Sequence, residues 1–211
     1  MSEELAALDL QGTWELVPLP SHAVPITSKW VFKIKTKSDG SIERYKARLV
    51  ARGFQQTPGL DYEETFALAV TTVRTLLAVA ASSSWAISQM DVKNAFLHGD
   101  LNEEVYMHPP PSVDAPSGYV CQLRRALYGL KQAPRAWFER FVSVIKVAGF
   151  KPSDHDPALF IHLSSHSRTL LLLYVDDILI MGDDVEHISL VKQQLHLHLI
   201  AQVHTRSYCS F

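Results

Sequence analysis

The chain has 211 residues, 47% of them hydrophobic, and its 20 basic residues nearly balance its 22 acidic ones. Such a chain is globular and buries a sizeable core, as one domain or as one domain with a mobile lobe. The formal net charge of −2 by itself predicts no polyanionic partner. The two cysteines lie far apart, and no leader or membrane-spanning segment is apparent, so we expect a reduced intracellular protein, cytoplasmic or nuclear, without a zinc site.

The N-terminal region and a following hairpin are the first predicted elements. Helix breakers among residues 1–28 predict an extended N-terminal arm: Gly12, Pro18, Pro20 and Pro25. After the arm, two alternating runs flank Asp39-Gly40, which indicates a hairpin with a two-residue loop. That loop sets the register and predicts four pairs on one face: Lys37 with Ile42, Lys35 with Arg44, Lys33 with Lys46 and Val31 with Arg48.

This hairpin is predicted to have a basic face and an apolar face. The segment from Lys29 to Arg52 carries eight basic and two acidic residues. Opposed like charges destabilise a hairpin, and arginines suit phosphate geometry, so the basic face is predicted to bind an anion. The alternative is a solvated lysine-rich edge that prevents aggregation. We expect the other face to pack on the body of the protein; it carries Trp30, Phe32, Ile34, Tyr45, Ala47 and Leu49.

The middle of the chain predicts a helix over residues 72–81, a strand over 85–92 that delivers Asp91, a loop or edge hairpin over 101–117, and a strand over 119–123. A further helix runs to about residue 148, with Gly149 as its stop. Basic residues surround its start, where they suit phosphate or nucleic acid, although surface cations at a helix start explain them equally well. These residues are Arg124, Arg125, Lys131 and Arg135.

Two adjacent carboxylates, Asp176 and Asp177, interrupt a long apolar run that reads as two buried strands joined by a turn. A solvated Asp-Asp turn is one interpretation. Asp91 is a third acid at a strand end, and three such acids match the oxygen ligands that a pair of Mg²⁺ ions requires. An unrelated metal-dependent phosphotransferase would also fit three acids.

The last predicted helix follows Gly182 and buries one stripe of residues, Ile188, Val191, Leu195 and Leu199. His196 and His198 lie two residues apart, so on a helix they point to different faces and do not converge on one metal ion. We expect both histidines to be solvated.

Several motifs together give the chain a strong resemblance to a known family. They begin at Trp30 (Trp-Val-Phe-Lys-Ile-Lys), Arg44 (Arg-Tyr-Lys-Ala-Arg-Leu-Val-Ala-Arg-Gly-Phe), Gln89 (Gln-Met-Asp-Val-Lys-Asn-Ala-Phe-Leu-His-Gly), Leu127 (Leu-Tyr-Gly-Leu-Lys-Gln-Ala-Pro-Arg-Ala-Trp) and Tyr174 (Tyr-Val-Asp-Asp). From about Gly12 to about Leu199 the chain resembles the reverse transcriptase domain of copia-type retrotransposon Pol polyproteins. The resemblance implies an α+β fold, the fingers and palm of a right-hand polymerase over residues 29–199, with an antiparallel palm sheet backed by helices and without a thumb.

The resemblance also implies roles for particular residues. Asp91, Asp176 and Asp177 resemble the catalytic metal ligands of two Mg²⁺ ions, which Mn²⁺ can replace, and the Val92 carbonyl resembles a metal or triphosphate contact. Phe96 resembles the gate against a ribose 2′-hydroxyl. Other implied nucleotide contacts are Lys46, Arg48, Tyr128 and Gly129, with either Lys46 or Arg48 as the closer triphosphate equivalent. Implied or predicted nucleic-acid contacts are Lys33, Lys35, Arg44, Lys131 and Arg135.

Two departures from the family pattern qualify this expectation. The stretch beginning at Thr65 is short and has Leu68 where a proline is expected, and residues 200–211 differ from the primer-gripping hairpin of the family. We therefore expect template-directed DNA synthesis from a primer-template and deoxynucleoside triphosphates to be impaired, unless other Pol segments act in trans. The alternative is a non-catalytic transposon remnant that folds and binds nucleic acid. No membrane partner is expected.

Overall fold

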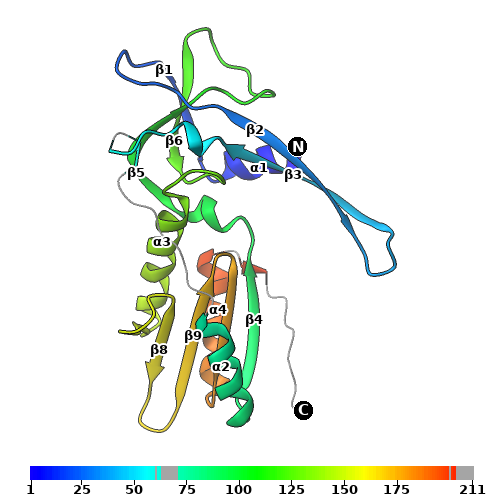
Figure 1. Ribbon diagram of the computed structural model, residues 1–211, viewed down its shortest axis with the longest axis vertical. Helices are drawn as coiled ribbons and strands as arrows, with labels where there is room; N and C mark the ends of the chain where they lie inside the picture. The colour runs from blue at the N-terminus through cyan, green and yellow to red at the C-terminus, as the bar shows by residue number, and fades with distance from the viewer. Residues whose placement is uncertain (60, 63–70, 200, 203–211) are drawn as a thin grey trace. The chain divides into compact units, whose positions relative to one another are not determined.

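The computed structural model describes residues 1–59, 61, 62, 71–199, 201 and 202 (Figure 1). The chain forms two compact units: unit 1 comprises Met1–Phe66 and Phe96–Glu139, and unit 2 comprises Ala67–Ala95 and Arg140–Phe211. Among the described residues the strands form three sheets with the orders β1-β6-β5, β2-β3 and β11-β4-β10-β9-β8-β7. Within these sheets the strand pairs are antiparallel. The expected mixture of antiparallel sheets and helices is confirmed.

The N-terminal region differs from the expected extended arm. Residues Ser2–Leu10 form helix α1, and Trp14–Pro18 form strand β1, which pairs with β6 (Tyr119–Arg125). Leu8 is 1% exposed and joins the core of unit 1. The helix breakers lie after α1, so burial of its apolar side chains decides the structure of residues 2–10. β5 (Asp100–Met107) pairs on the other side of β6, so the segment predicted as a loop or an edge hairpin, residues 101–117, contains one edge strand followed by a loop.

The predicted hairpin consists of β2 (Ser28–Thr36) and β3 (Ile42–Ala51), and in Figure 1 its tip extends well away from the rest of unit 1. The register agrees with the prediction at Lys35↔Arg44, Lys33↔Lys46 and Val31↔Arg48. At the tip it differs, because Thr36 rather than Lys37 lies opposite Ile42, after a register shift. The connection is longer than two residues: the Lys37 N–H donates to the Ser41 carbonyl at 2.9 Å.

The expected packing of the apolar hairpin face holds only near its base. Leu49 is fully buried, whereas Phe32 is 66%, Ile34 54% and Tyr45 74% exposed. The period-two alternation of side chains correctly predicted that these residues share one face of the hairpin. It does not predict how much of that face the rest of unit 1 covers. The outer half of the hairpin therefore has both faces in solvent.

The base of the hairpin is joined to the loop that precedes α3 (Ala133–Val147). The Ala51 N–H donates to the Tyr128 carbonyl at 2.8 Å. Gly129 has φ +93°, and a Cβ there would lie 2.1 Å from the Ala51 carbonyl oxygen. Nearby, the buried Gln56 amide donates to the Gln132 side chain at 3.0 Å and accepts from the Lys131 N–H at 2.9 Å. Close backbone approach thus holds β3 against residues 128–132.

Unit 2 is built on the six-stranded sheet. The two central pairings join β10 (Asp177–Gly182) to β4 (Ala86–Val92) and to β9 (Arg168–Tyr174). On the outer side of β9 lie β8 (Leu159–Leu163) and the short β7 (Lys151–Pro152), and β11 (Ala201–Gln202) pairs with β4 at the other edge. Consecutive residues of β9 and β10 are buried, so both faces of the sheet are covered at these two strands.

The helices that follow the N-terminal region agree closely with the sequence predictions. α2 (Thr71–Ser82) contributes Leu76 and Ala80 to a core with Leu172 and Met181 of the sheet. α3 ends before Gly149, which has φ +83°. α4 (Val185–Leu199) buries the predicted stripe, and His196 and His198 are exposed, as expected: the buried set is Ile188, Val191, Leu195 and Leu199. In the described part of the chain no helix combines the length and apolar character that a membrane span requires.

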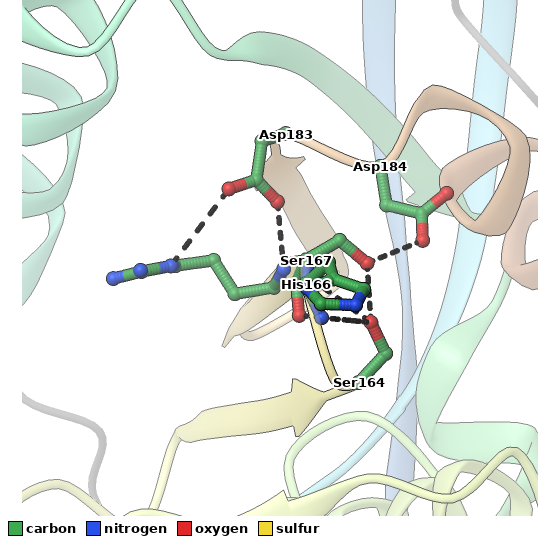
Figure 2. Close-up of polar contacts among 6 residues, drawn as sticks. Ser164, His166, Ser167, Asp183 and Asp184 are labelled. Atoms are coloured by element: carbon green, nitrogen blue, oxygen red, sulfur yellow. Dashed lines mark hydrogen bonds and ion pairs between the residues drawn. The ribbon is translucent and has the colours of Figure 1, made fainter.

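A polar network fixes the start of α4 to the β8–β9 turn (Figure 2). The Asp184 carboxylate accepts from the His187 N–H at 2.8 Å, as an N-cap does, and from the Ser167 hydroxyl at 2.7 Å. These two donors hold the pKa of Asp184 below its usual range. Asp183 accepts from the Arg168 N–H at 2.6 Å.

Two departures from the family pattern noted in the sequence cannot be compared with the structure. The region around Leu68 and the residues after Gln202 lie outside the described residues.

The stacked pair His162 and His187 makes the stability of unit 2 sensitive to pH. Their ring centroids are 4.0 Å apart. Burial lowers the pKa of His187, and His162 lowers it further, against the opposing effect of Asp184. The unfolded state therefore binds more protons, so the free energy of unfolding should fall as the pH is lowered below about 6.5. We expect His187→Gln to reduce this slope, and the exposed-site control His198→Gln to leave it unchanged, in urea unfolding between about pH 5 and 7.5. Equal slopes in both variants would contradict the assignment.

Substitution of Gly129 tests the close approach between β3 and the loop. Gly129→Ala combines a left-handed φ with an overlap on the Ala51 carbonyl, whereas Gly40 has φ +82° but nothing within 4 Å of an added Cβ. We expect Gly40→Ala to cost about 1 kcal/mol, which is the conformational cost alone, and Gly129→Ala to cost at least about 3 kcal/mol. Chemical denaturation of both variants measures the difference, and similar losses would show that the approach is easily relaxed.

Candidate functional site

Unit 2 carries two acids opposite each other near the ends of two neighbouring strands. Asp91 of β4 and Asp177 of β10 are cross-strand partners. Directly opposed residues of an antiparallel pair project from the same face, with Cβ atoms about 4.5 to 5.5 Å apart. Both side chains are partly exposed. The pairing therefore creates a concentrated negative charge that water, a ligand or a cation can reach.

Asp176 lies in the turn that joins β9 to β10. Tyr174 pairs with Asp177, so Val175 and Asp176 form a two-residue turn. Val175 has φ 56°, a left-handed conformation that strains a β-branched residue. The Val92 N–H donates to the Asp176 carbonyl at 2.8 Å, which ties the turn to the end of β4. Strained residues held by their surroundings cluster at functional sites, and Val175 directly precedes the Asp176-Asp177 pair.

Gln89 is a site residue that sequence reasoning did not identify. It lies two residues before Asp91 on the same face of β4, and its Nε2 donates to the Asp177 Oδ1 at 3.0 Å. The sequence already placed Gln89 on the same strand face as Asp91, because residues i and i+2 of a strand share a face. Its hydrogen bond to Asp177 depends in addition on the β4–β10 register, which the sequence did not reveal. Gln89 orients one carboxylate of the pair.

The acid pair offers the donor chemistry that a hard cation requires. Carboxylate and carbonyl oxygens suit Mg²⁺, which keeps several waters and takes few protein ligands. Two adjacent carboxylates on one sheet face therefore fit such an ion. Across the described ranges no group of three or more His, Cys, Asp or Glu side chains is arranged to hold a metal. The metal-binding roles of Asp91, Val92, Asp176 and Asp177 stay predictions.

Unit 1 gathers several predicted nucleotide contacts into one cluster. The Arg48 guanidinium carbon lies 4.6 Å from the Tyr128 ring centroid, and the rings of Phe96 and Tyr128 meet edge to face at 4.9 Å. Gly129 follows Tyr128 in the loop that is held against β3. Residues distant in the sequence therefore form one cationic and aromatic surface, and the Arg48–Tyr128 contact is a cation–π interaction.

Lys46 extends this surface with charge that is poorly neutralised. Burial lowers the pKa of Lys46, and the neighbouring cations Arg48, Arg44 and Lys35 lower it further, whereas Glu4 raises it. Repulsion among side chains on one hairpin face means that an anion bound there relieves unfavourable electrostatics. Lys33 is exposed and lies directly opposite Lys46.

The basic residues around the start of α3 are arranged differently from the prediction. Arg124 and Arg125 belong to β6 and pair with Glu15 and Asp100, so they do not flank the helix start. Arg135 pairs with Glu103, and with Glu139 at 3.8 Å, so protein carboxylates already neutralise it. Cations that form ion pairs within the protein are poorer phosphate ligands. Lys131 is exposed.

Comparison with known proteins agrees with the motifs. The family model described as reverse transcriptase (RNA-dependent DNA polymerase) matches residues 11–204. The Retrovirus-related Pol polyproteins from transposons RE1 and RE2 of Arabidopsis thaliana are each 50% identical over 190 residues, which cover 87% of this chain and 13% of the relative. That from transposon TNT 1-94 of Nicotiana tabacum is 45% identical over 200 residues, covering 92% of this chain and 15% of the relative.

The resemblance to copia-type Pol polyproteins is confirmed, and the family match continues into the residues that form β11. The chain spans 13 to 15% of the length of these curated relatives. An RNA-dependent DNA polymerase family implies, in general terms, a nucleic-acid template and nucleotide substrates. The match covers most of the chain and carries the acid and hairpin motifs, and the chain therefore belongs to the reverse transcriptase family.

Proposed function

We propose that the chain provides the fingers and palm of a polymerase that copies RNA or DNA templates into DNA. The observation that carries this proposal is the pairing of Asp91 with Asp177 beside the Asp176 turn. A buried sheet holds the strands, while the carboxylates stay accessible at their ends. The fold keeps two like charges adjacent, and a positively charged ligand is the simplest compensation.

The ligand proposed for the site formed by Asp91, Asp176 and Asp177 is a pair of Mg²⁺ ions, for which Mn²⁺ can substitute. When bound, such ions lower the pKa of a primer 3′-hydroxyl and neutralise charge on the triphosphate. The protein residues have simpler tasks: Asp91, Asp176 and Asp177 provide oxygen ligands, and Gln89 keeps the Asp177 carboxylate oriented.

The cluster in unit 1 is proposed to bind the incoming nucleotide. Lys46 and Arg48 neutralise the triphosphate, because an ammonium and a guanidinium on one strand face match several phosphate oxygens. Tyr128 and Gly129 form a surface against the nucleotide, and the ring of Phe96 excludes a ribose 2′-hydroxyl. The contact of Phe96 with Tyr128 supports this role, since it fixes the ring from one side.

Incorporation of one deoxynucleotide on a primed RNA template tests the acid site. We expect Asp91→Asn and Asp176→Asn to lower single-nucleotide incorporation with Mg²⁺ by at least about 100-fold, because a metal-bound reaction loses several kcal/mol of charge stabilisation. The matched control is Asp154→Asn, an exposed acid of unit 2, which should stay within about twofold. Incorporation that survives in both site variants would exclude the proposed metal role.

A second candidate function, binding of nucleic acid without catalysis, is favoured by the exposed basic hairpin. We expect replacement of Lys33, Lys35, Arg44 and Lys46 by glutamine to weaken binding of a single-stranded oligonucleotide. The slope of log affinity against log salt should fall by roughly 0.7 for each phosphate that the hairpin no longer neutralises. Lys151→Gln, at an exposed lysine of unit 2, is the control. An unchanged slope would assign the lysines to solubility, and intact binding without any incorporation would favour this second function.

A further inference from the structure

Two buried glutamines join segments of unit 1 that are distant in the sequence. Gln56 is 7% exposed and follows the short 3₁₀ helix η1 (Gly53–Gln55), and the fully buried Gln132 directly precedes α3. The Gln56 Nε2 donates to the Gln132 Oε1 at 3.0 Å, and the Gln132 Nε2 donates to the Asp61 carbonyl at 2.9 Å. The Gln56 Oε1 accepts from the Lys131 N–H at 2.9 Å. The two side chains thus connect the segment after β3 to the loop before α3.

Backbone groups at both ends fix the orientation of each amide. The Lys131 N–H requires an oxygen, so the Gln56 nitrogen faces Gln132. The Asp61 carbonyl requires a donor, so the Gln132 oxygen faces Gln56. Asp61 is itself anchored, since its carboxylate accepts from the Thr57 N–H at 2.6 Å. Only one arrangement satisfies both backbone groups and both amides, so the pair holds the loop in one position.

The loop held in this way carries the surface proposed to meet the nucleotide. The Tyr128 ring meets the Phe96 ring edge to face at 4.9 Å. On the opposite side the loop has no room to shift, because a Cβ on Gly53 would lie 2.0 Å from the Gly129 carbonyl oxygen. The Gln56 Oε1 would lie 3.2 Å from the same Cβ. Close packing therefore blocks movement of the loop toward residue 53, and the amide pair opposes movement away from it.

We propose that Gln56 and Gln132 are positioning residues for nucleotide selection. By fixing the loop, they hold Tyr128 against Phe96 and so set how strongly the site rejects a ribose 2′-hydroxyl. The proposal rests on the nucleotide-binding roles proposed for Tyr128, Gly129 and Phe96. Both glutamines are buried and act through the loop backbone rather than on the nucleotide. An aromatic gate rejects a hydroxyl only while its ring cannot yield, and contact with a fixed Tyr128 makes the Phe96 ring yield less.

The ratio of deoxynucleotide to ribonucleotide use measures this role. A misplacement of about 1 Å can change a rate by about 100-fold, so a smaller shift of Tyr128 is expected to change the ratio by about tenfold. A general loss of stability does not imitate this effect, because inactive protein lowers the rates with both nucleotides alike.

Selection between dATP and ATP by the full chain on a primed RNA template tests the pair. We expect Gln132→Met to lower the ratio of kcat/KM for dATP to kcat/KM for ATP by at least about tenfold. Equilibrium binding of both nucleotides, with a primer that lacks the 3′-hydroxyl, repeats the comparison without chemistry. The double variant Gln56→Met/Gln132→Met leaves neither amide without its partner. It should lower the ratio as much as the single variant, and it replaces the single variant if that one does not fold.

Thr13→Val is the matched control within the same unit. Thr13 is 1% exposed, and its hydroxyl donates to the Leu8 carbonyl at 2.7 Å. Valine keeps the shape of the side chain and removes this buried hydrogen bond, far from residues 128–132 in the sequence and without a bond to them. Chemical denaturation measures the stability that each variant loses. The selection ratio of Thr13→Val should stay within about twofold of the unmodified protein.

The outcomes separate the positioning role from the proposed function. If the unmodified protein binds neither nucleotide, or binds both equally, the proposed nucleotide site and its gate are wrong, and the positioning role falls with them. If the unmodified protein prefers dATP but Gln132→Met keeps the ratio of Thr13→Val, the glutamines only stabilise the fold. The inference is then overturned while the nucleotide site stands. A ratio that falls in Gln132→Met and in the double variant, but not in Thr13→Val, supports the inference.

Discussion

The antiparallel pairing of β4 with β10 is the constraint on which the candidate site depends. It places Asp91 opposite Asp177 and lets the Val92 N–H hold the Asp176 carbonyl. Electrostatics alone would separate the two carboxylates, because like charges repel and lose solvation when they are held close together. The apolar residues further along both strands supply the free energy that holds them, since burial of each large aliphatic side chain contributes about 1.5 to 3 kcal/mol. The chemistry of the site is therefore supported by the core beneath it.

In unit 1 the equivalent constraint is the close approach of the Gly129 backbone to Ala51. It holds Tyr128 beside Arg48 and leaves the guanidinium stacked on a ring rather than extended into solvent. A preorganised cation loses less conformational entropy when it binds a phosphate.

The hairpin illustrates where local reasoning succeeds and where it stops. Alternation and the Asp39-Gly40 turn predicted the register of the paired residues from Val31 to Lys35, because side chains repeat every two residues in a strand. The tip differs by one residue, since the longer connection introduces a register shift. Exposure of Phe32 and Tyr45 was not predictable either, because it depends on how far the rest of the unit extends along the hairpin.

The sequence by itself determined the strands that end in acids, the buried stripe of α4 and the family, because these depend on periodicity, turn residues and contiguous motifs. Tertiary structure alone decided that α1 is a helix docked on β3, that Gln89 contacts Asp177, and that Arg135 is neutralised by Glu103. The docking of α1 and the two side-chain contacts all join residues far apart along the chain, and no local pattern predicts which distant residues meet. The physical reason is that ion pairs and side-chain hydrogen bonds need positions set by packing, which arise only when distant segments share one core.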